Sequence, residues 1–317
     1  MFSMKGFLAA LVTSSTFGLL PLFTLPVMGD GMHVLAILFY RFLFSAGLLM
    51  LLLLGLRCDL RITRAEGWTL AGLSLFYDGS AAFLFWAYHY LPGGVAATIN
   101  FLYPVIVTVI MIGWFHEKKS FWTFCALALA FGGVAALSLS KGSNGQGIRL
   151  LGVGVDLISA LSYALYIVWV NHSCVRKMPM LKLNFYVFLF AAAGMGVLAV
   201  ATGQLQAVPD GKSYANLTLM ALICTVVSNI TLVYAIQHLG STLTSVLGAM
   251  ESVTAVLVGV WVFGEAFTPV LALGILLIIL SVTVVVLSPH LTPIFRFFKY
   301  YYLTEMRGKH RTLRAPR

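Results

Sequence analysis

Three ionisable side chains stand deep inside long apolar segments of this 317-residue chain. Asp78 lies near the middle of its segment, Glu251 a third to halfway along its own, and Arg41 about a third of the way along another. An ionised group in an apolar interior must pair, become neutral or face a polar cavity. Asp78, far from any loop, is therefore the first candidate for a proton site or a substrate-ammonium site. A structural pair is the alternative.

Glu251 and Arg41 each have a functional and a structural interpretation. An internal duplication, described below, aligns Glu251 with Tyr103, so only one copy carries a carboxylate, and function commonly breaks the symmetry of a duplicated scaffold. The alternative is a hydrogen-bonded structural glutamate that faces the apolar segment 214–238. Arg41 can pair with Asp78 or hold a substrate carboxylate through its planar fork of donors.

Polar and aromatic side chains in the same segments complete the candidate site. The main ones are Asn100, Tyr103, Tyr163 and Asn229, accompanied by Ser14, Tyr77, Trp86, Tyr88, Ser162, Trp169 and Ser228. Each alone is typical of helix packing, but together they suit an amphipathic organic solute better than a bare ion, because aromatic faces can hold an ammonium group. Asp156, near the end of its segment, is expected to be solvated or paired with a loop.

Known enzyme motifs do not fit these residues. Intramembrane proteases need paired acids, a Ser-His pair across helices or His-Glu-x-x-His, whereas Asp78 has no partner acid and His116-Glu117-Lys118 has no second histidine. The four cysteines have neither metal-ligand nor disulfide spacing, and no glycine-rich nucleotide loop occurs. We therefore expect a protein that is not an enzyme and has no metal or cofactor.

The composition predicts an all-α integral membrane protein. Hydrophobic residues make up 60% of the chain and charged residues 9%, whereas about a quarter of a soluble domain is charged. Ten apolar segments are long enough to span a bilayer. They lie near 4–27, 32–56, 68–90, 93–115, 120–140, 150–172, 182–203, 214–238, 241–263 and 268–288. Six glycines are expected to permit close helix contact: Gly47, Gly72, Gly132, Gly133, Gly194 and Gly196.

The basic residues predict how these segments are oriented. Sixteen of the 20 Lys and Arg residues fall on one side, three on the other, and Arg41 lies within a span. By the positive-inside rule, we expect both termini to be cytoplasmic, in a cell inner membrane. The basic, aromatic tail 289–317 fits contact with the anionic inner leaflet, so the net charge of +10 does not require a nucleic-acid partner.

The chain repeats itself at an offset of about 148 residues. Pairs at this spacing include Gly6 with Gly154, Ser14 with Ser162, Ser80 with Ser228, Ala87 with Ala235 and Glu117 with Glu265. The repeats cover 7–140 and 150–288. Because each has five spans, an odd number, the second must enter the membrane inverted relative to the first. The loop with Lys118 and Lys119 is basic, and its counterpart at Glu265 has no basic residue, as inversion requires.

Three local patterns add a family resemblance. They are the helix-end glutamates in Gly113-Trp114-Phe115-His116-Glu117 and Val262-Phe263-Gly264-Glu265, the run Met250-Glu251-Ser252-Val253-Thr254-Ala255-Val256-Leu257, and the pair Arg41-Phe42. With the duplication, they resemble the EamA branch of the drug/metabolite transporter superfamily over nearly the whole chain. Ser252 replaces the family's usual proline, which predicts that the helix 241–263 is straighter than its family counterparts.

The resemblance implies alternating-access transport through a central cavity, and it favours a structural ion pair for Arg41. We expect an exporter of a small metabolite, such as an amino acid, in which protonation of Asp78 or Glu251 couples a proton to the cargo. An uncoupled facilitator or exchanger is the alternative, as is a lipid-translocating or sensory membrane protein. The expected partners are a small-molecule substrate and the lipid bilayer. The pattern does not define an oligomeric state.

Overall fold

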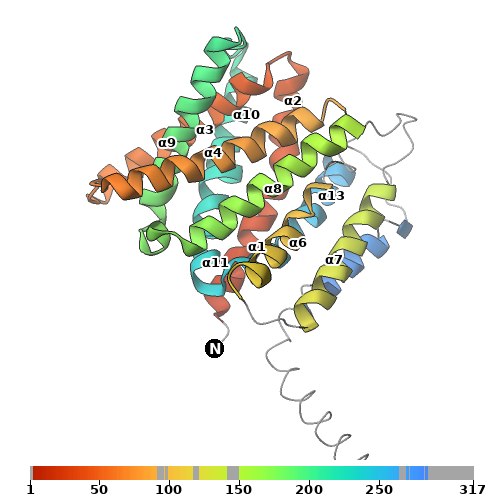
Figure 1. Cartoon of the computed structure of the whole chain (residues 1–317). Helices are drawn as coiled ribbons and strands as arrows, with labels where there is room; N and C mark the ends of the chain where they lie inside the picture. Colours follow the sequence, from red (N-terminus) through yellow and green to blue (C-terminus); the bar gives the residue numbers. More distant parts are fainter. Residues whose placement is uncertain are drawn as a thin grey trace, which may run out of the picture.

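The chain folds into a bundle of helices (Figure 1). The computed structural model describes residues 3–90, 96, 99–116, 121–140, 150–263, 269–270, 272–281 and 283–284, and these ranges contain no strand. The predicted all-α class is confirmed for this part of the chain. The helix-end residues Glu117 and Glu265, and the tail 289–317, lie outside the described residues.

The helices follow the two predicted repeats in order. The first half contains α1 (Met4–Gly18), α2 (Leu20–Gly29), α3 (Val34–Gly55), α4 (Arg64–Ala87), α6 (Tyr103–Gly113) and α7 (Phe121–Ser140). The second half contains α8 (Leu150–His172), the 3-10 helix η1 (Cys174–Lys177), α9 (Met180–Ala201), α10 (Gly211–Leu219), the π-helix η2 (Met220–Val227), α11 (Ser228–Leu239), α12 (Ser241–Leu247) and α13 (Met250–Phe263). Local chemistry sets several of these ends: Thr63 and Glu66 form a reciprocal capping box that starts α4.

Within the described residues, seven helical stretches are long and apolar enough to cross a membrane, by length and composition. Three shorter apolar helices fall inside the other predicted spans: Tyr103–Gly113, Phe121–Gly133 and Ala272–Ser281. The protein is therefore a multi-pass membrane protein, and the described part of the chain contains seven clear spans, whereas the sequence predicts ten over the whole chain. Part of the difference has a local cause, because the predicted span 93–115 is interrupted before α6 begins.

Two interruptions occur at equivalent places in the two halves. In the first half a turn at Phe101 and Leu102 precedes α6, whose second residue, Pro104, has no N–H to continue a helix from the preceding turn. In the second half Gly248 and Ala249 separate α12 from α13. Paired discontinuous helices of this kind mark the binding region of many inverted-repeat transporters.

The helix predicted over 241–263 is interrupted at Gly248 and Ala249. Tyr103 fills the space beside Gly248, and a Cβ added at Gly248 would collide with the Tyr103 hydroxyl. The same hydroxyl donates to the carbonyl of Ser245 at 3.5 Å. A glycine and an intruding tyrosine therefore mark the interruption, even without the proline that is missing at Ser252. The predicted helix 4–27 is also divided, at Leu19, just before Pro21.

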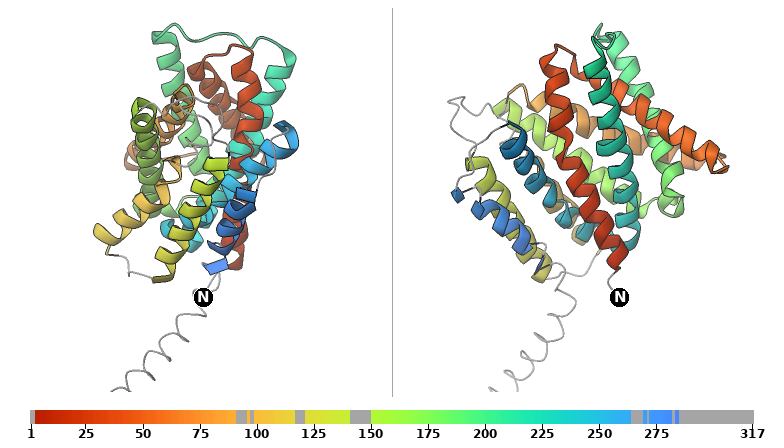
Figure 2. Two further views of the ribbon diagram at one scale, coloured as in Figure 1. Left: turned by 90° about the vertical axis from the view of Figure 1, so that its right-hand side faces the viewer. Right: turned by 180° about the vertical axis from the view of Figure 1, so that it is seen from behind.

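The two halves pack against each other helix by helix (Figures 1 and 2). The most extensive pairings join α3 with α9, α4 with α8, and α1 with α11. In the duplication α4 corresponds to α11, α1 to α8 and α3 to α9. If the two halves are exchanged, the α4–α8 pairing therefore becomes the α11–α1 pairing, and the α3–α9 pairing maps onto itself. The interface thus has the pseudo-twofold relation expected of a duplicated bundle.

Four of the six glycines predicted to allow close helix contact do so. Added Cβ atoms would meet Trp169 at Gly72, Ile278 at Gly133, Asp78 at Gly194 and Phe39 at Gly196, all at 3.3 Å or less. The prediction is wrong for Gly47, which is exposed and has no atom within 4 Å of an added Cβ, and Gly132 has only a loose contact at 4.0 Å. Sequence periodicity did not indicate the close contact between α1 and α13 at Gly18.

Replacing Gly18 with alanine is expected to destabilise the protein by about 1–3 kcal/mol, as overpacked core sites do. The new methyl would lie 2.5 Å from the Glu251 carbonyl oxygen and 2.6 Å from Thr254 Cβ, and backbone cannot rotate away. Gly47→Ala is the matched control, because it enters open space and should gain about 0.5–1 kcal/mol from helix propensity. Thermal unfolding in detergent measures both. Equal stability of the two variants would contradict the close α1–α13 contact.

Candidate functional site

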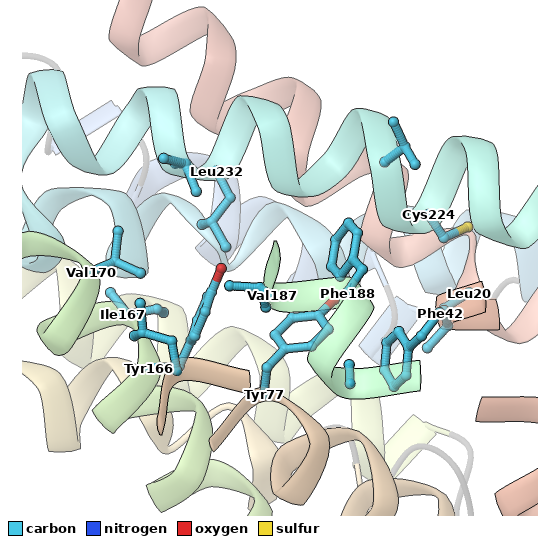
Figure 3. Close-up of a cluster of buried hydrophobic side chains, with 14 of the residues drawn as sticks. Leu20, Phe42, Tyr77, Tyr166, Ile167, Val170, Val187, Phe188, Cys224 and Leu232 are labelled. Carbon is cyan, nitrogen blue, oxygen red and sulfur yellow. The ribbon is translucent and has the colours of Figure 1, made fainter. Parts of the chain in front are cut away.

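A cavity of about 50 Å³ lies between the two halves, beside the helix interruptions. Twelve residues line it: Phe17, Leu20, Arg41, Tyr77, Ser80, Ala81, Leu84, Phe85, Asn100, Tyr103, Tyr163 and Glu251. They come from α1, α2, α3, α4, α6, α8 and α13, with Asn100 from the short helical stretch that precedes α6. We refer to this cavity as the central pocket. Figure 3 shows the buried cluster beside it, in which Tyr77 and Leu20 also take part.

Five of the seven predicted site residues line the central pocket: Arg41, Asn100, Tyr103, Tyr163 and Glu251. Asn229 lies one hydrogen bond away, because its side-chain amide donates to the Tyr77 hydroxyl at 2.8 Å and Tyr77 is part of the lining. Asp78 does not line the pocket. The structure therefore brings together six of the predicted residues and separates the seventh from them.

Arg41 is held by the second half of the chain. It is 2% exposed, and its Nε donates to Thr225 Oγ1 at 2.7 Å. Thr225 lies in the π-helix η2, where its hydroxyl also donates to the carbonyl of Met220, five residues earlier, at 3.1 Å. A second guanidinium nitrogen is 3.5 Å from the Tyr77 hydroxyl, and the guanidinium carbon is 5.5 Å from the centroid of the Phe42 ring. These contacts use two of the five guanidinium donors.

The expected ion pair between Arg41 and Asp78 does not form. The hydrogen bonds of Arg41 go to Thr225 and Tyr77, and Asp78 is on another face of α4. One oxygen of Asp78 is 3.5 Å from the Ser74 hydroxyl and the other has no hydrogen-bond partner. A Cβ at Gly194 of α9 would lie 3.3 Å from the carboxyl, so Asp78 points toward α9 and away from the pocket.

Glu251 and Tyr103, the aligned pair of the duplication, both face the central pocket. Glu251 is in the first turn of α13, next to the interruption, where the N-terminal end of a helix favours negative charge. The Tyr103 ring packs edge-on against Tyr163, with ring centroids 4.8 Å apart. The alternative of a structural glutamate that faces the segment 214–238 stays a prediction.

Asp156 is buried, whereas the sequence predicts a solvated or loop-paired residue. Its exposed fraction is 0%, and neither carboxyl oxygen has a hydrogen-bond partner of regular geometry, so it is not at a solvated helix end. Its neighbour one helical turn along, Ser159, donates to the carbonyl of Ser80 at 2.8 Å and lies 3.4 Å from the side-chain oxygen of Asn100. Ser80 and Asn100 belong to the pocket lining.

Gly240 lies at the turn between two helices of the second half. Gly240 adopts φ +83 between α11 and α12, a conformation that glycine tolerates and other residues rarely do, which supports a tight turn there. Its first-half counterparts, Gly93 and Gly94, lie outside the described residues.

Comparison with known proteins agrees with this architecture. A family model described as "EamA-like transporter family" matches residues 4–139 and again residues 150–287. A solved structure described only as "Crystal structure of protein" has 17% sequence identity and a TM-score of 0.77, and the match covers 90% of this chain and 98% of that one. That likeness shows a shared fold. No curated protein has a matching sequence.

The two matched units and the paired helices define a multi-pass membrane transporter of the drug/metabolite type. Within that class the chain belongs to the EamA-like transporter family, because two matches to the family model, over residues 4–139 and 150–287, together cover almost the whole sequence.

Proposed function

We propose that this protein is a secondary transporter of the inner membrane that exports a small metabolite, an amino acid or a similar solute, by alternating access. The observation that carries the proposal is the lining of the central pocket. A cation, Arg41, and a carboxylate, Glu251, face one cavity between the two halves, and the guanidinium bonds to Thr225 and Tyr77 rather than to Glu251. A zwitterionic solute complements this arrangement.

The two charged groups have matched partners in an amino acid. A guanidinium binds a carboxylate through paired, charge-assisted hydrogen bonds, and Arg41 retains donors for them. Glu251 is the complementary acceptor for an ammonium group. Tyr103 and Tyr163 both line the pocket, and their aromatic ring faces also attract a cation.

The size of the pocket supports a moving carrier rather than an open channel. Its volume of about 50 Å³ has room for one or two water molecules, whereas ligand pockets usually enclose about 300–1,000 Å³. A metabolite can enter only if helices from the two halves separate. The interruptions at 101–102 and 248–249 border the pocket and are suitable places for such movement.

Coupling to a proton is part of the proposal, with Asp78 and Glu251 as candidate proton carriers. In this scheme both termini are cytoplasmic, in keeping with the distribution of Lys and Arg. An uncoupled exchanger uses the same pocket but needs neither carboxyl group to change protonation. The two schemes therefore differ in how transport responds to an imposed proton gradient.

Replacing Asp78 with asparagine is expected to abolish gradient-driven accumulation of the cargo, because the side chain keeps its shape but cannot release a proton. Purified protein in liposomes, an imposed proton gradient and a labelled amino acid provide the measurement. Asp59→Asn is the matched control, since Asp59 is exposed in a loop and the new amide oxygen can still accept from the Arg61 N–H.

Undiminished accumulation by Asp78→Asn would remove Asp78 from the coupling mechanism and leave Glu251 as the candidate. Equal transport by the wild-type protein with and without the gradient would contradict coupling altogether and favour the uncoupled exchanger.

A further inference from the structure

Asp156 is a buried acid that the proposed cargo site does not use. It lies in the second turn of α8, its exposed fraction is 0%, and both carboxyl oxygens are without a hydrogen-bond partner. The backbone N–H of Asn100 approaches the carboxyl group without a hydrogen bond of regular geometry. A carboxylate here would carry an uncompensated charge in an apolar bundle, which is costly and rarely without function.

A line of polar groups extends along α8 from the position of Asp156 toward the central pocket. Asp156, Ser159 and Tyr163 are spaced by three and four residues, so they lie on one face of α8. The Ser159 hydroxyl contacts the Ser80 carbonyl at 2.8 Å, the Ser80 hydroxyl at 3.4 Å and the Asn100 side-chain oxygen at 3.4 Å. Ser80, Asn100 and Tyr163 all line the pocket.

No cation in the described part of the chain faces Asp156. The elements that pack against α8 are α4, α6, α11, α12 and η1. Tyr88, at the end of α4, is the titratable group beside Asp156, and Tyr103 of α6 lies in the pocket. α12 has no titratable residue. The basic and titratable residues of η1 and α11 gather near the opposite end of α8, where Gln237 donates to the Arg176 carbonyl at 2.7 Å.

We propose that Asp156 is a proton-binding site that exchanges with the central pocket through Ser159, Ser80 and Asn100. Proton binding forms one O–H bond on the carboxylate and removes its charge, and proton release breaks the same bond. A proton fits better than a metal cation, because the backbone N–H of Asn100 approaches the carboxyl group and the Ser159 hydroxyl directs its hydrogen to the Ser80 carbonyl. The inference deepens the proposed function and rests on it for the role of the pocket.

Infrared spectroscopy of the full chain in liposomes tests the site independently of transport. A protonated carboxylic acid has a carbonyl band that an ionised carboxylate and an amide do not share. We expect Asp156→Asn to remove one such band and Asp59→Asn to leave the bands unchanged. Ser159→Ala should keep the Asp156 band but slow its response to a pH jump, because the contacts toward the pocket are cut. In wild-type protein, added sodium ions should leave the band in place.

The same variants are then compared by the ratio of uptake with a proton gradient to uptake without it. The proposal predicts loss of the gradient response in Asp156→Asn and a reduced response in Ser159→Ala. An Asp156 band that is absent in the wild type, that disappears on addition of sodium ions or that does not respond to pH would overturn it. Absence of any transport by the wild-type protein contradicts the proposed function instead, and leaves the infrared result to decide the proton site separately.

Discussion

Replacing Arg41 with methionine is expected to lower cargo exchange on the order of tenfold to a hundredfold while the protein stays folded. The loss corresponds to about 1.5–3 kcal/mol for charge-assisted hydrogen bonds to a cargo carboxylate. The fold should tolerate the change because Thr225 keeps its bond to Met220 and the Tyr77 hydroxyl keeps its bond from Asn229. Buried ionic groups can often be replaced by apolar residues of similar volume without loss of stability.

Counterflow in liposomes and thermal unfolding in detergent, measured on the same preparation, separate the two possible roles of Arg41. Analogues of the cargo without the carboxylate provide a second control, since their exchange should be insensitive to the substitution. A large loss of thermal stability with normal exchange per folded molecule would show that Arg41 is structural, as the family resemblance implies.

Replacing Glu251 with glutamine is expected to remove both the preference for a free ammonium group and the response to a proton gradient. The amide keeps the shape of the side chain but loses the negative charge that faces the central pocket. We expect a tenfold or larger loss for ammonium-bearing cargo, on the order of one charge-assisted interaction. Exchange is measured for an amino acid and for its N-acetylated analogue.

Glu66→Gln is the matched control for Glu251→Gln. Glu66 closes the capping box at the start of α4, away from the pocket, and glutamine also serves in that motif. If the two variants transport equally well, Glu251 has no part in cargo binding or coupling. A loss confined to thermal stability would identify Glu251 as a structural residue of α13.

The duplication made much of the site predictable from the sequence. The offset of about 148 residues aligns Tyr103 with Glu251, and both face the pocket beside equivalent interruptions. The interruption at Gly248 was not predicted, because it depends on the side chain of Tyr103 entering from the other half. The π-helix that presents Thr225 to Arg41 likewise depends on contacts between the halves, and the local sequence gives no sign of it.

Helical spacing indicates which face of a helix a residue occupies, whereas the depth of the residue in its apolar segment does not. Tyr77, Ser80, Ala81 and Leu84 are spaced by three, four and seven residues and form the stripe of α4 that lines the pocket. Asp78 lies at the edge of this stripe, three residues before Ala81 and seven before Phe85, and its carboxyl points toward Gly194 of α9. Depth alone had made it the leading candidate for a cavity residue.

The same spacing could have identified Asp156, seven residues before the pocket residue Tyr163. Its nearness to the end of a predicted span indicated solvent instead. Burial there results from the packing of α8 against α4 and from the approach of Asn100, contacts that join distant parts of the sequence.

The most direct test of a cargo site between Arg41 and Glu251 is counterflow in liposomes with a panel of labelled amino acids. We expect saturable exchange of one class of zwitterion, with analogues that lack either the carboxylate or the ammonium group exchanged much more slowly. Folded protein that exchanges no amino acid, or that exchanges both kinds of analogue as fast as the zwitterion, would contradict it.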